Sequence, residues 1–163
     1  YRLPRLGEDR TIEIDPSRRE YDLPMITSNA VVVGFPETPQ SIHRRVYRVY
    51  KARAQIVFSH RFAMLRRNPA IAALGEPISV TVRLMRRRWG SCFSDGRIAL
   101  NPELLAARIA EIDYVILHEL CHLREHNHSR RFYRLMNDLM PDWRIRRERL
   151  NEQIPIGFLR APG

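Results

Sequence analysis

The chain has 163 residues, with 28 Lys or Arg against 18 Asp or Glu, so its formal net charge is +10. This length is typical of one domain, and a hydrophobic fraction of 44% excludes a disordered chain. No uncharged apolar run approaches the ~18 residues that a membrane span needs, so we expect no membrane partner. All basic residues except Lys51 are arginines, which indicates either a GC-rich coding sequence or a surface for nucleic acid or another polyanion.

The two cysteines, Cys92 and Cys121, have no spacing typical of a metal ribbon or a disulfide framework. Such sparse thiols suit a reducing compartment, and no secretory signal is recognisable, so we expect a cytoplasmic protein. The sequence begins with Tyr1 rather than Met, and we therefore expect residues upstream of it.

Short strands and turns are expected over residues 1–36. Strand-forming residues gather in Thr11–Ile14 and Ala30–Phe35. Turn-forming residues bound them: Asp15-Pro16, Ser28-Asn29, Gly34 and Pro36.

A long helix is expected next. Thr38-Pro39 predicts its start, because a capping hydroxyl precedes a proline at the first helical position. Asn68-Pro69 predicts its end. Apolar residues recur near helical spacing between these limits: Ile42, Val46, Val49, Tyr50, Ile56, Val57, Ala63 and Met64. The solvent face is expected to carry the basic residues, which are Arg44, Arg45, Arg48, Lys51 and Arg53.

The middle of the chain is expected to form a β-hairpin. Ile78–Leu84 alternates apolar and polar residues, which predicts a strand with one buried face that Arg86–Trp89 extends. Ser94-Asp95-Gly96 predicts the turn, and Arg97–Leu100 the partner strand.

Helices are expected over the rest of the chain. Asn101-Pro102 caps a short one, and Pro141 separates the last two. The expected ranges are Glu103–Ala107, Glu111–Arg124, Ser129–Met140 and Trp143–Gln153.

The segment His118-Glu119-Leu120-Cys121-His122 has the HExxH pattern. Two histidines at i and i+4 share one helical face, about 6 Å apart along the axis, so both imidazoles can reach one ion. Glu119 can then accept a proton from a water held by that ion. Apolar residues flank the segment, and buried histidines need a partner such as a metal. Chance occurrence of the pattern is the alternative.

A third ligand separates a catalytic metal site from a chance match. His126 is on the same face as His118, but eight residues of straight helix rise about 12 Å, too far for one ion. His128 can reach only if the helix stops and the chain folds back. Asn127 and Ser129 favour such a stop, so we prefer His128 and expect His126 to be an exposed turn residue.

The interval from His118 to His128 also matches the HExxHxxGxxH order of the metzincin proteases. However, Glu125 occupies the glycine position, and the usual continuation after the third histidine is absent. We therefore interpret the site as a related geometric solution rather than as a member of that class.

Several motifs between Val80 and Leu150 together resemble the YgjP-like family of zinc metallopeptidases, which is itself similar to the SprT and WLM families. The resemblance implies an α+β, zincin-like fold with zinc bound by His118, His122 and His128 and with Glu119 as catalytic base. The motifs that carry it are Trp89-Gly90-Ser91-Cys92, Gly96–Asn101, Ile112–Val115, His118–Leu123, Asn127-His128-Ser129, Phe132 and Pro141-Asp142-Trp143.

The expected architecture is a single domain over residues 1–163. Residues 1–76 supply less characteristic strands and the long helix, and residues 77–153 carry the motifs. We expect a small mixed or antiparallel sheet, an active-site helix that carries HExxH, and C-terminal helices. One zinc ion per chain would lower the pKa of a bound water to roughly 7.

The leading prediction is a zinc-dependent peptidase in which Glu119 acts as general base and then as general acid. An edge strand with Trp89, Gly90 and Ser91 could pair with an extended peptide or protein substrate. Asp113 and Glu125 are candidates to orient a ligand imidazole, although Asp113 also suits the positive start of its helix. The group that stabilises the carbonyl oxygen stays open among Tyr114, Tyr133, Arg130 and Arg131.

Two alternatives remain from other classes. The arginine-rich surface predicts a module associated with nucleic acid, which the SprT and WLM resemblance would make a protease of DNA-bound protein. No helix-turn-helix, zinc finger or RNA-binding signature accompanies that charge. The other alternative is a metal hydrolase that acts on a non-peptide bond, because HExxH alone does not exclude one.

Overall fold

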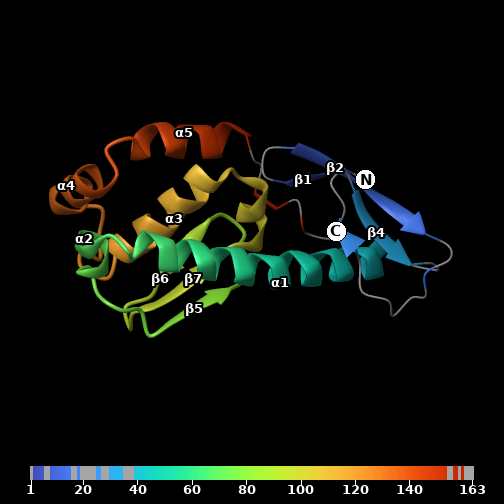
Figure 1. Cartoon of the computed structure of the whole chain (residues 1–163), viewed down its shortest axis with the longest axis horizontal. Coiled ribbons are helices and arrows are strands. Elements are labelled where there is room, and N and C mark those ends of the chain that lie inside the picture. The colour runs from blue at the N-terminus through green and yellow to red at the C-terminus, as the bar shows by residue number, and fades with distance from the viewer. Residues whose placement is uncertain are drawn as a thin grey trace.

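The computed structural model describes residues 2–5, 8–15, 18, 25–26, 30–34, 39–153, 156–157 and 159. It has the expected α+β composition, with two small sheets and a set of helices, of which the longest, α1 (Pro39–Leu65), runs along the length of the molecule (Figure 1). The strands are β1 (Arg2–Arg5), β2 (Glu8–Asp15), β3 (Met25–Ile26), β4 (Ala30–Gly34), β5 (Ser79–Val82), β6 (Gly90–Cys92) and β7 (Arg97–Leu100). The helices are α1 (Pro39–Leu65), α2 (Pro69–Ala72), the 3-10 helix η1 (Pro102–Ala106), α3 (Ile109–Cys121), α4 (Arg130–Leu139) and α5 (Trp143–Gln153).

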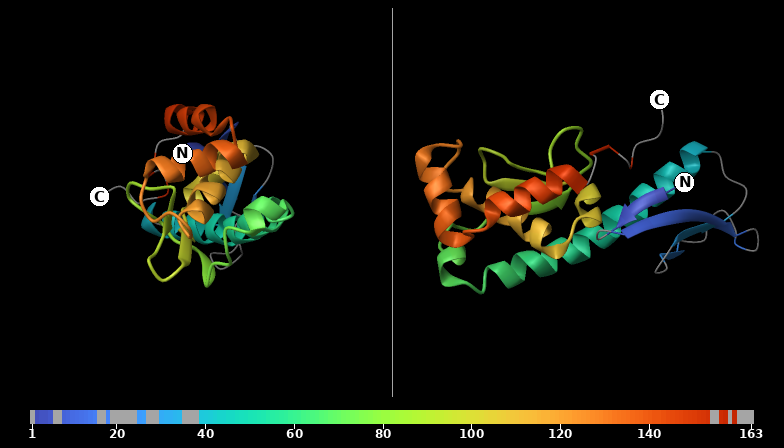
Figure 2. Two further views of the ribbon diagram at one scale, coloured as in Figure 1. Left: turned by 90° about the vertical axis from the view of Figure 1, so that its left-hand side faces the viewer. Right: turned by 90° about the horizontal axis from the view of Figure 1, so that it is seen from above.

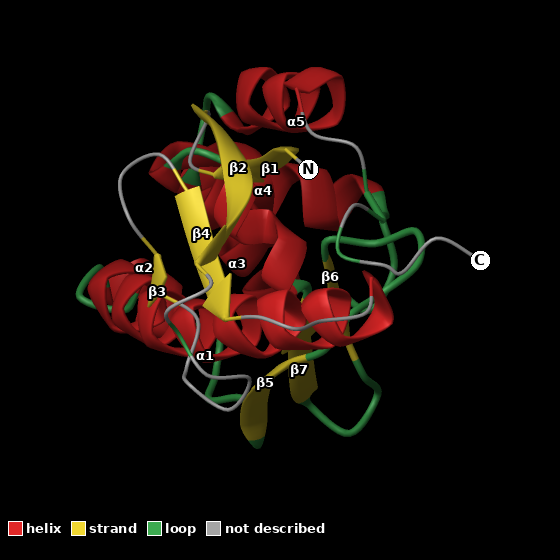
Figure 3. Ribbon diagram, turned by 90° about the vertical axis from the view of Figure 1, so that its right-hand side faces the viewer, coloured by secondary structure: helices red, strands yellow, loops and turns green. Residues whose placement is uncertain are grey.

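The N-terminal strands form a four-stranded sheet in the order β1-β2-β4-β3. β2 and β4 are parallel, and each has an antiparallel neighbour on its outer side. The sheet lies at one end of α1 (Figures 1 and 3). The expected strand Thr11–Ile14 falls within β2, and Ala30–Phe35 covers β4, with Phe35 outside the described residues. The assembly of these strands into a separate sheet was not expected. The expected turn residues Pro16, Ser28-Asn29 and Pro36, and the expected cap Thr38, lie outside the described residues.

α1 is a helix of 27 residues whose buried positions recur every fourth residue: Val46, Tyr50, Ala54 and Phe58. This corrects the expected faces at three positions, one of which is Ala63, an apolar residue that is exposed. Ile56 is 67% exposed, because it lies on the side of the helix away from this stripe. Arg45 is only 6% exposed, at the end of the helix that passes the N-terminal sheet (Figure 1). Asn68 then accepts a hydrogen bond from the amide of Ala70 and caps α2, so the long helix ends where expected.

The second sheet has the order β5-β7-β6, with β5 parallel and β6 antiparallel to β7. The expected extension of the first strand through Arg86–Trp89 is wrong, because the chain leaves β5 and crosses to the other side of β7. The side-chain amide of Asn101 fixes that crossing by donating to the carbonyl oxygens of Met85 and Arg88. The expected turn at Ser94-Asp95-Gly96 joins β6 to β7. Ile78, expected on the buried face, precedes the strand and is 73% exposed.

Side-chain caps mark the first turns of two of the helices that follow. Asn101 accepts from the amide of Glu103 at the start of η1, and Ser129 accepts from that of Phe132 at the start of α4. α3 lies between α1 and α5 (Figures 1 and 2) and also contacts β6 and α4. It is therefore buried along most of its length, and Ile112, Ile116, Leu117 and Leu120 are at most 1% exposed.

Among the helices that the structure describes, none combines the length and the apolar character that crossing a bilayer requires.

Candidate metal centre

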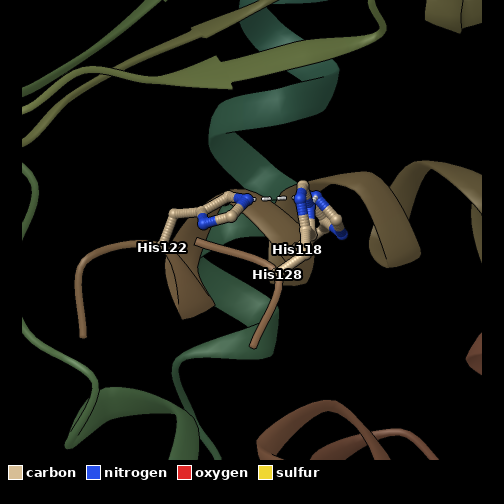
Figure 4. Close-up of side chains that lie close together, drawn as sticks. All are labelled: His118, His122 and His128. Atoms are coloured by element: carbon tan, nitrogen blue, oxygen red, sulfur yellow. Dashed lines mark hydrogen bonds between the residues drawn. The ribbon is translucent and has the colours of Figure 1, made fainter. Parts of the chain in front are cut away.

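Three histidines converge where α3 ends and the chain turns back. α3 carries His118 in its last turn, and His122 is the residue that follows its last position. The next residues form a turn rather than a further helical turn, and His128 comes directly before Ser129, the cap of α4. The chain therefore reverses between His122 and His128 and returns an imidazole to the two on the helix (Figure 4).

The ring nitrogens of these histidines lie at distances that suit one metal ion. Nε2 of His118 is 3.2 Å from Nε2 of His122 and 3.0 Å from Nε2 of His128. One ligand atom from each residue lies within 4.8 Å of the others. In a tetrahedral zinc site with Zn–N distances of about 2.0–2.1 Å, ligand nitrogens are about 3.3–3.4 Å apart. The spacing therefore fits a small tetrahedral cation.

The protonation of the histidines also fits a metal. The ring Nδ1 of His122 lies 2.9 Å from the carbonyl oxygen of Glu125, to which it can only donate, and this leaves its Nε2 with a free lone pair. Burial lowers the pKa of His118 to about 3, helped by the neighbouring His122 and His128. Burial also lowers the pKa of His122. Both imidazoles are therefore neutral at pH 7, the state in which they bind metals.

Phe132 forms an apolar support beneath all three rings. Its side chain is fully buried in the first turn of α4. Its ring centroid lies 4.9 Å from that of His118, 4.5 Å from that of His122 and 4.8 Å from that of His128. Tyr133, the next residue, stacks on the exposed His128 with the ring centroids 6.1 Å apart. These contacts limit how far each imidazole can rotate, so the three nitrogens stay directed at a common point.

Glu119 is buried beside this cluster and is only 5% exposed. Burial raises the pKa of its carboxyl to about 8, while a hydrogen bond from the backbone amide of Cys92 and the charge of Arg88 act in the opposite direction. A Cβ atom added at Gly90 would lie 2.5 Å from Oε1 of Glu119 and 2.7 Å from its Cγ. The backbone of β6 therefore rests directly on the carboxylate, and only glycine allows that approach.

β6 is an edge strand, and its free edge faces Glu119. The amide of Asn101 donates to the carbonyl of Trp89, and the amide of Phe93 donates to that of Arg97. Because hydrogen bonding alternates along an antiparallel pair, Ser91 directs its backbone groups at β7, whereas Gly90 and Cys92 direct theirs outward. The amide of Cys92 is taken by Glu119, which leaves the polar groups of Gly90 on the open edge.

A cavity of about 600 Å³ opens over the histidines and Glu119. One wall is the segment from Arg87 to Cys92, and α5 forms the opposite wall. Tyr114, one turn before His118 on α3, also lines it. Burial raises the pKa of Tyr114 to about 12, so its hydroxyl keeps its proton at neutral pH.

The other residues considered from the sequence lie elsewhere or act differently. His126 is exposed on the turn and lines the cavity, but it is not among the three clustered histidines. Asp113 does not orient an imidazole, because Nε and Nη2 of Arg61 on α1 hold its two oxygens at 2.8 and 2.7 Å. Glu125 acts on His122 through its backbone carbonyl rather than its side chain. Arg130 and Arg131 are absent from the cavity lining, whereas Tyr133 is part of it.

Sequence reasoning missed the wall formed by α5. Trp143, Arg147, Leu150 and Asn151 all line the cavity. In the sequence they belong to an amphipathic helix rich in arginine, and nothing local shows which arginine turns toward the site. Only the packing of α5 against α3 determines that.

Comparison with known protein families identifies a match over most of the chain. Residues 1–153 match the model of a family described as "YgjP-like, metallopeptidase domain". No curated protein and no solved structure matches the chain. The match extends to the first residue, well beyond the part between Val80 and Leu150 in which the resemblance is visible by eye.

Proposed function

Because the chain belongs to the YgjP-like metallopeptidase family, we propose that it is a zinc-dependent peptidase with a zincin-like catalytic domain over residues 1–163. His118, His122 and His128 would hold the metal, and Glu119 would be the general base. The observation that carries the proposal is the convergence of three Nε2 atoms beside a buried carboxylate, at the floor of a cavity bordered by a free strand edge.

The donor set favours zinc among the metals that a peptidase uses. Three imidazoles suit a borderline ion, and three protein ligands leave a fourth position open for water or substrate, as in catalytic zinc sites. When bound, zinc supplies Lewis-acid polarisation and a nucleophile at neutral pH.

Glu119 is placed to move protons. Its carboxyl group lies next to His118 in sequence, and its pKa of about 8 is close to neutrality, where a general base and acid is most effective. It would accept the proton of the attacking water and later deliver it to the leaving amine. The amide of Cys92 holds the carboxylate in position by donating a hydrogen bond to it.

The free edge of β6 would bind the substrate as an added strand, with Trp89, Gly90 and Ser91 forming the docking segment. Gly90 supplies the outward amide and carbonyl, and main-chain pairing of this kind tolerates many side chains. Tyr114, whose hydroxyl keeps its proton, would donate to the carbonyl oxygen of the scissile bond.

Metal analysis tests the ligand set. We expect about one zinc per chain, with His122→Ala or His128→Ala losing the ion and His126→Ala keeping it. His126 is the matched control, because it is an exposed histidine of the same turn. A requirement for His126 rather than His128 would contradict the proposed site.

Peptide hydrolysis tests the mechanism. Unlabelled protein substrates should be cleaved by the zinc-loaded protein and spared after chelation. Glu119→Gln should retain zinc and lose at least 100-fold in turnover, since general acid–base catalysis contributes roughly 10²–10⁴-fold. Turnover equal to that of the wild type in this variant would exclude Glu119 as the base.

A further inference from the structure

Three arginines line the cavity, and they are unevenly placed around it. Arg87 and Arg88 lie in the segment that leads into β6, and Arg147 lies on α5 across the cavity. The lining contains a single carboxylate, that of Glu119, which is buried beneath the histidines. The walls that a substrate side chain would meet are therefore positively charged.

Among the described residues, the side chains of these three arginines form no ion pair and no hydrogen bond, unlike others nearby. On α5, Arg146 pairs with Asp142 at 2.9 Å, and Arg144 donates to Asn137. Arg147, the next residue along, is exposed and forms no ion pair in the part of the chain that the structure describes. Its charge is thus available to a ligand.

Arginines on both walls interact electrostatically with the groups proposed to take part in the reaction. Arg88 acts on Glu119, whose pKa its charge lowers against the larger effect of burial. The charge of Arg147 likewise lowers the pKa of Tyr114 and that of His118. Arg88 and Arg147 also line the same cavity as Glu119, Tyr114 and His118, so their charges border the place where a scissile bond would sit.

The position of Arg88 is also fixed by the fold. The side-chain amide of Asn101, which is fully buried, donates to the carbonyl oxygen of Arg88 at 3.1 Å. The same amide donates to the carbonyl of Met85, so the whole crossing between β5 and β6 is held. A fixed backbone lowers the entropic cost of presenting the guanidinium to a ligand.

We propose that this site selects peptides with acidic side chains beside the scissile bond, held by Arg88 and Arg147 from opposite walls of the cavity. The inference rests on the proposed peptidase function and specifies its substrate class. A peptide is favoured over nucleic acid because the charges border a cavity of about 600 Å³ next to a free strand edge. A carboxylate side chain of a strand added to β6 can enter such a cavity, and guanidinium groups bind carboxylates well.

Binding to the zinc-loaded Glu119→Gln protein tests the preference without turnover. The probes are a short fluorescent peptide rich in glutamate and the same peptide with glutamine at those positions. We expect the glutamate peptide to bind more tightly, and Arg88→Gln or Arg147→Gln to weaken it by about three- to fivefold each, as expected for partly exposed ion pairs. Affinity for the glutamine peptide should hardly change.

Two control variants remove the same charge outside the cavity. Arg86→Gln precedes the lining segment, and Arg149→Gln lies on α5 two residues after Arg147; neither residue lines the cavity. Both should bind the glutamate peptide as the parent does. Equal losses in all four variants would overturn the proposal in favour of unspecific attraction by net charge.

Two further results would also overturn the proposal. One is equal affinity for the two peptides. The other is displacement of the glutamate peptide by a single-stranded oligonucleotide. This result would count against the proposal if the oligonucleotide bound more tightly than the peptide and its binding required the same two arginines. Cleavage by the wild-type protein without an acidic preference would refute only this inference. Acid-selective binding without any cleavage would instead refute the proposed function.

Discussion

Gly90 marks the closest approach between β6 and the active-site helix, since any Cβ atom there would overlap Glu119. We expect Gly90→Ala to destabilise the protein by about 1–3 kcal/mol, the usual range for overpacking, and to reduce peptide cleavage by displacing the carboxyl group. Urea unfolding and turnover measure the two effects. Ser91→Ala, a neighbouring change that adds no atoms, should leave stability nearly unchanged. Wild-type stability in Gly90→Ala would mean that β6 can move away from Glu119.

The buried carboxyl of Glu119 should make the stability of chelator-treated protein depend on pH. In the unfolded chain this group ionises near 4.5, whereas burial raises its folded pKa to about 8. Its contribution to stability is therefore lost as the pH rises between these values. His118 acts oppositely: its pKa falls from 6.5 to about 3, so its contribution is lost as the pH falls below 6.5.

Of these two groups, therefore, only Glu119 changes the stability of the protein between pH 6.5 and pH 8. We expect the free energy of unfolding of the metal-free protein to fall across this interval by about 1–2 kcal/mol. Glu119→Gln, which cannot ionise, should show a flatter dependence. Parallel curves for the two proteins would show that the group titrates near its ordinary value.

At the scale of elements, one ion pair joins α1 to α3. Arg61 holds Asp113 through two hydrogen bonds, and the side chains are 22% and 11% exposed. Replacing Arg61 by Met would leave a nearly buried carboxylate without its partner, so we expect a loss of about 1–3 kcal/mol in chemical unfolding. Asp113→Asn in the same protein should recover part of that loss. Additive effects of the two changes would show that the contact contributes little.

The elements that local chemistry specifies could be predicted from the sequence. Asn101 and Ser129 each accept a hydrogen bond from an amide at the start of the helix that follows, and these caps explain why the starts of η1 and α4 were predicted closely. Asn68 caps α2 in the same way, but it was expected only to end the long helix, and α2 itself was not predicted. The crossing between β5 and β6 could not be predicted, because it depends on Asn101, which is distant in sequence from Met85.

The candidate site divides in the same way. The i and i+4 spacing and the stop favoured by Asn127 and Ser129 predict which histidines come together, because both are local properties of the chain. The helix itself ends at Cys121, three residues before its predicted end at Arg124. The carbonyl of Glu125 and the wall formed by α5 have no such signal. A backbone group is the same at every residue, and the direction of Arg147 is decided by the packing of α5 on α3.

At the scale of the whole molecule, the charge of +10 is spread over several helices. Arg44 and Arg48 are exposed on α1, Arg131 on α4 and Arg149 on α5. A distributed charge of this kind predicts weak, unspecific binding of duplex DNA that falls steeply with salt. We expect measurable affinity at low salt, none at physiological salt, and no change with Arg147→Gln. Binding that persists at physiological salt would favour the nucleic-acid-associated alternative.

The end of the described chain is tied to the interior by Glu103. This carboxylate is fully buried in η1, and it accepts hydrogen bonds from the amides of Gly157 and Leu159 at 2.7 and 2.8 Å. Both donors lie beyond residue 153, where the family match stops, yet Leu159 is as buried as the core. In hydrogen–deuterium exchange we therefore expect these two amides to exchange at the same slow rate as the amides of the long helix α1, as part of one cooperative unit. A chain that ended at residue 153 would leave the Glu103 carboxylate in an apolar interior without these two donors.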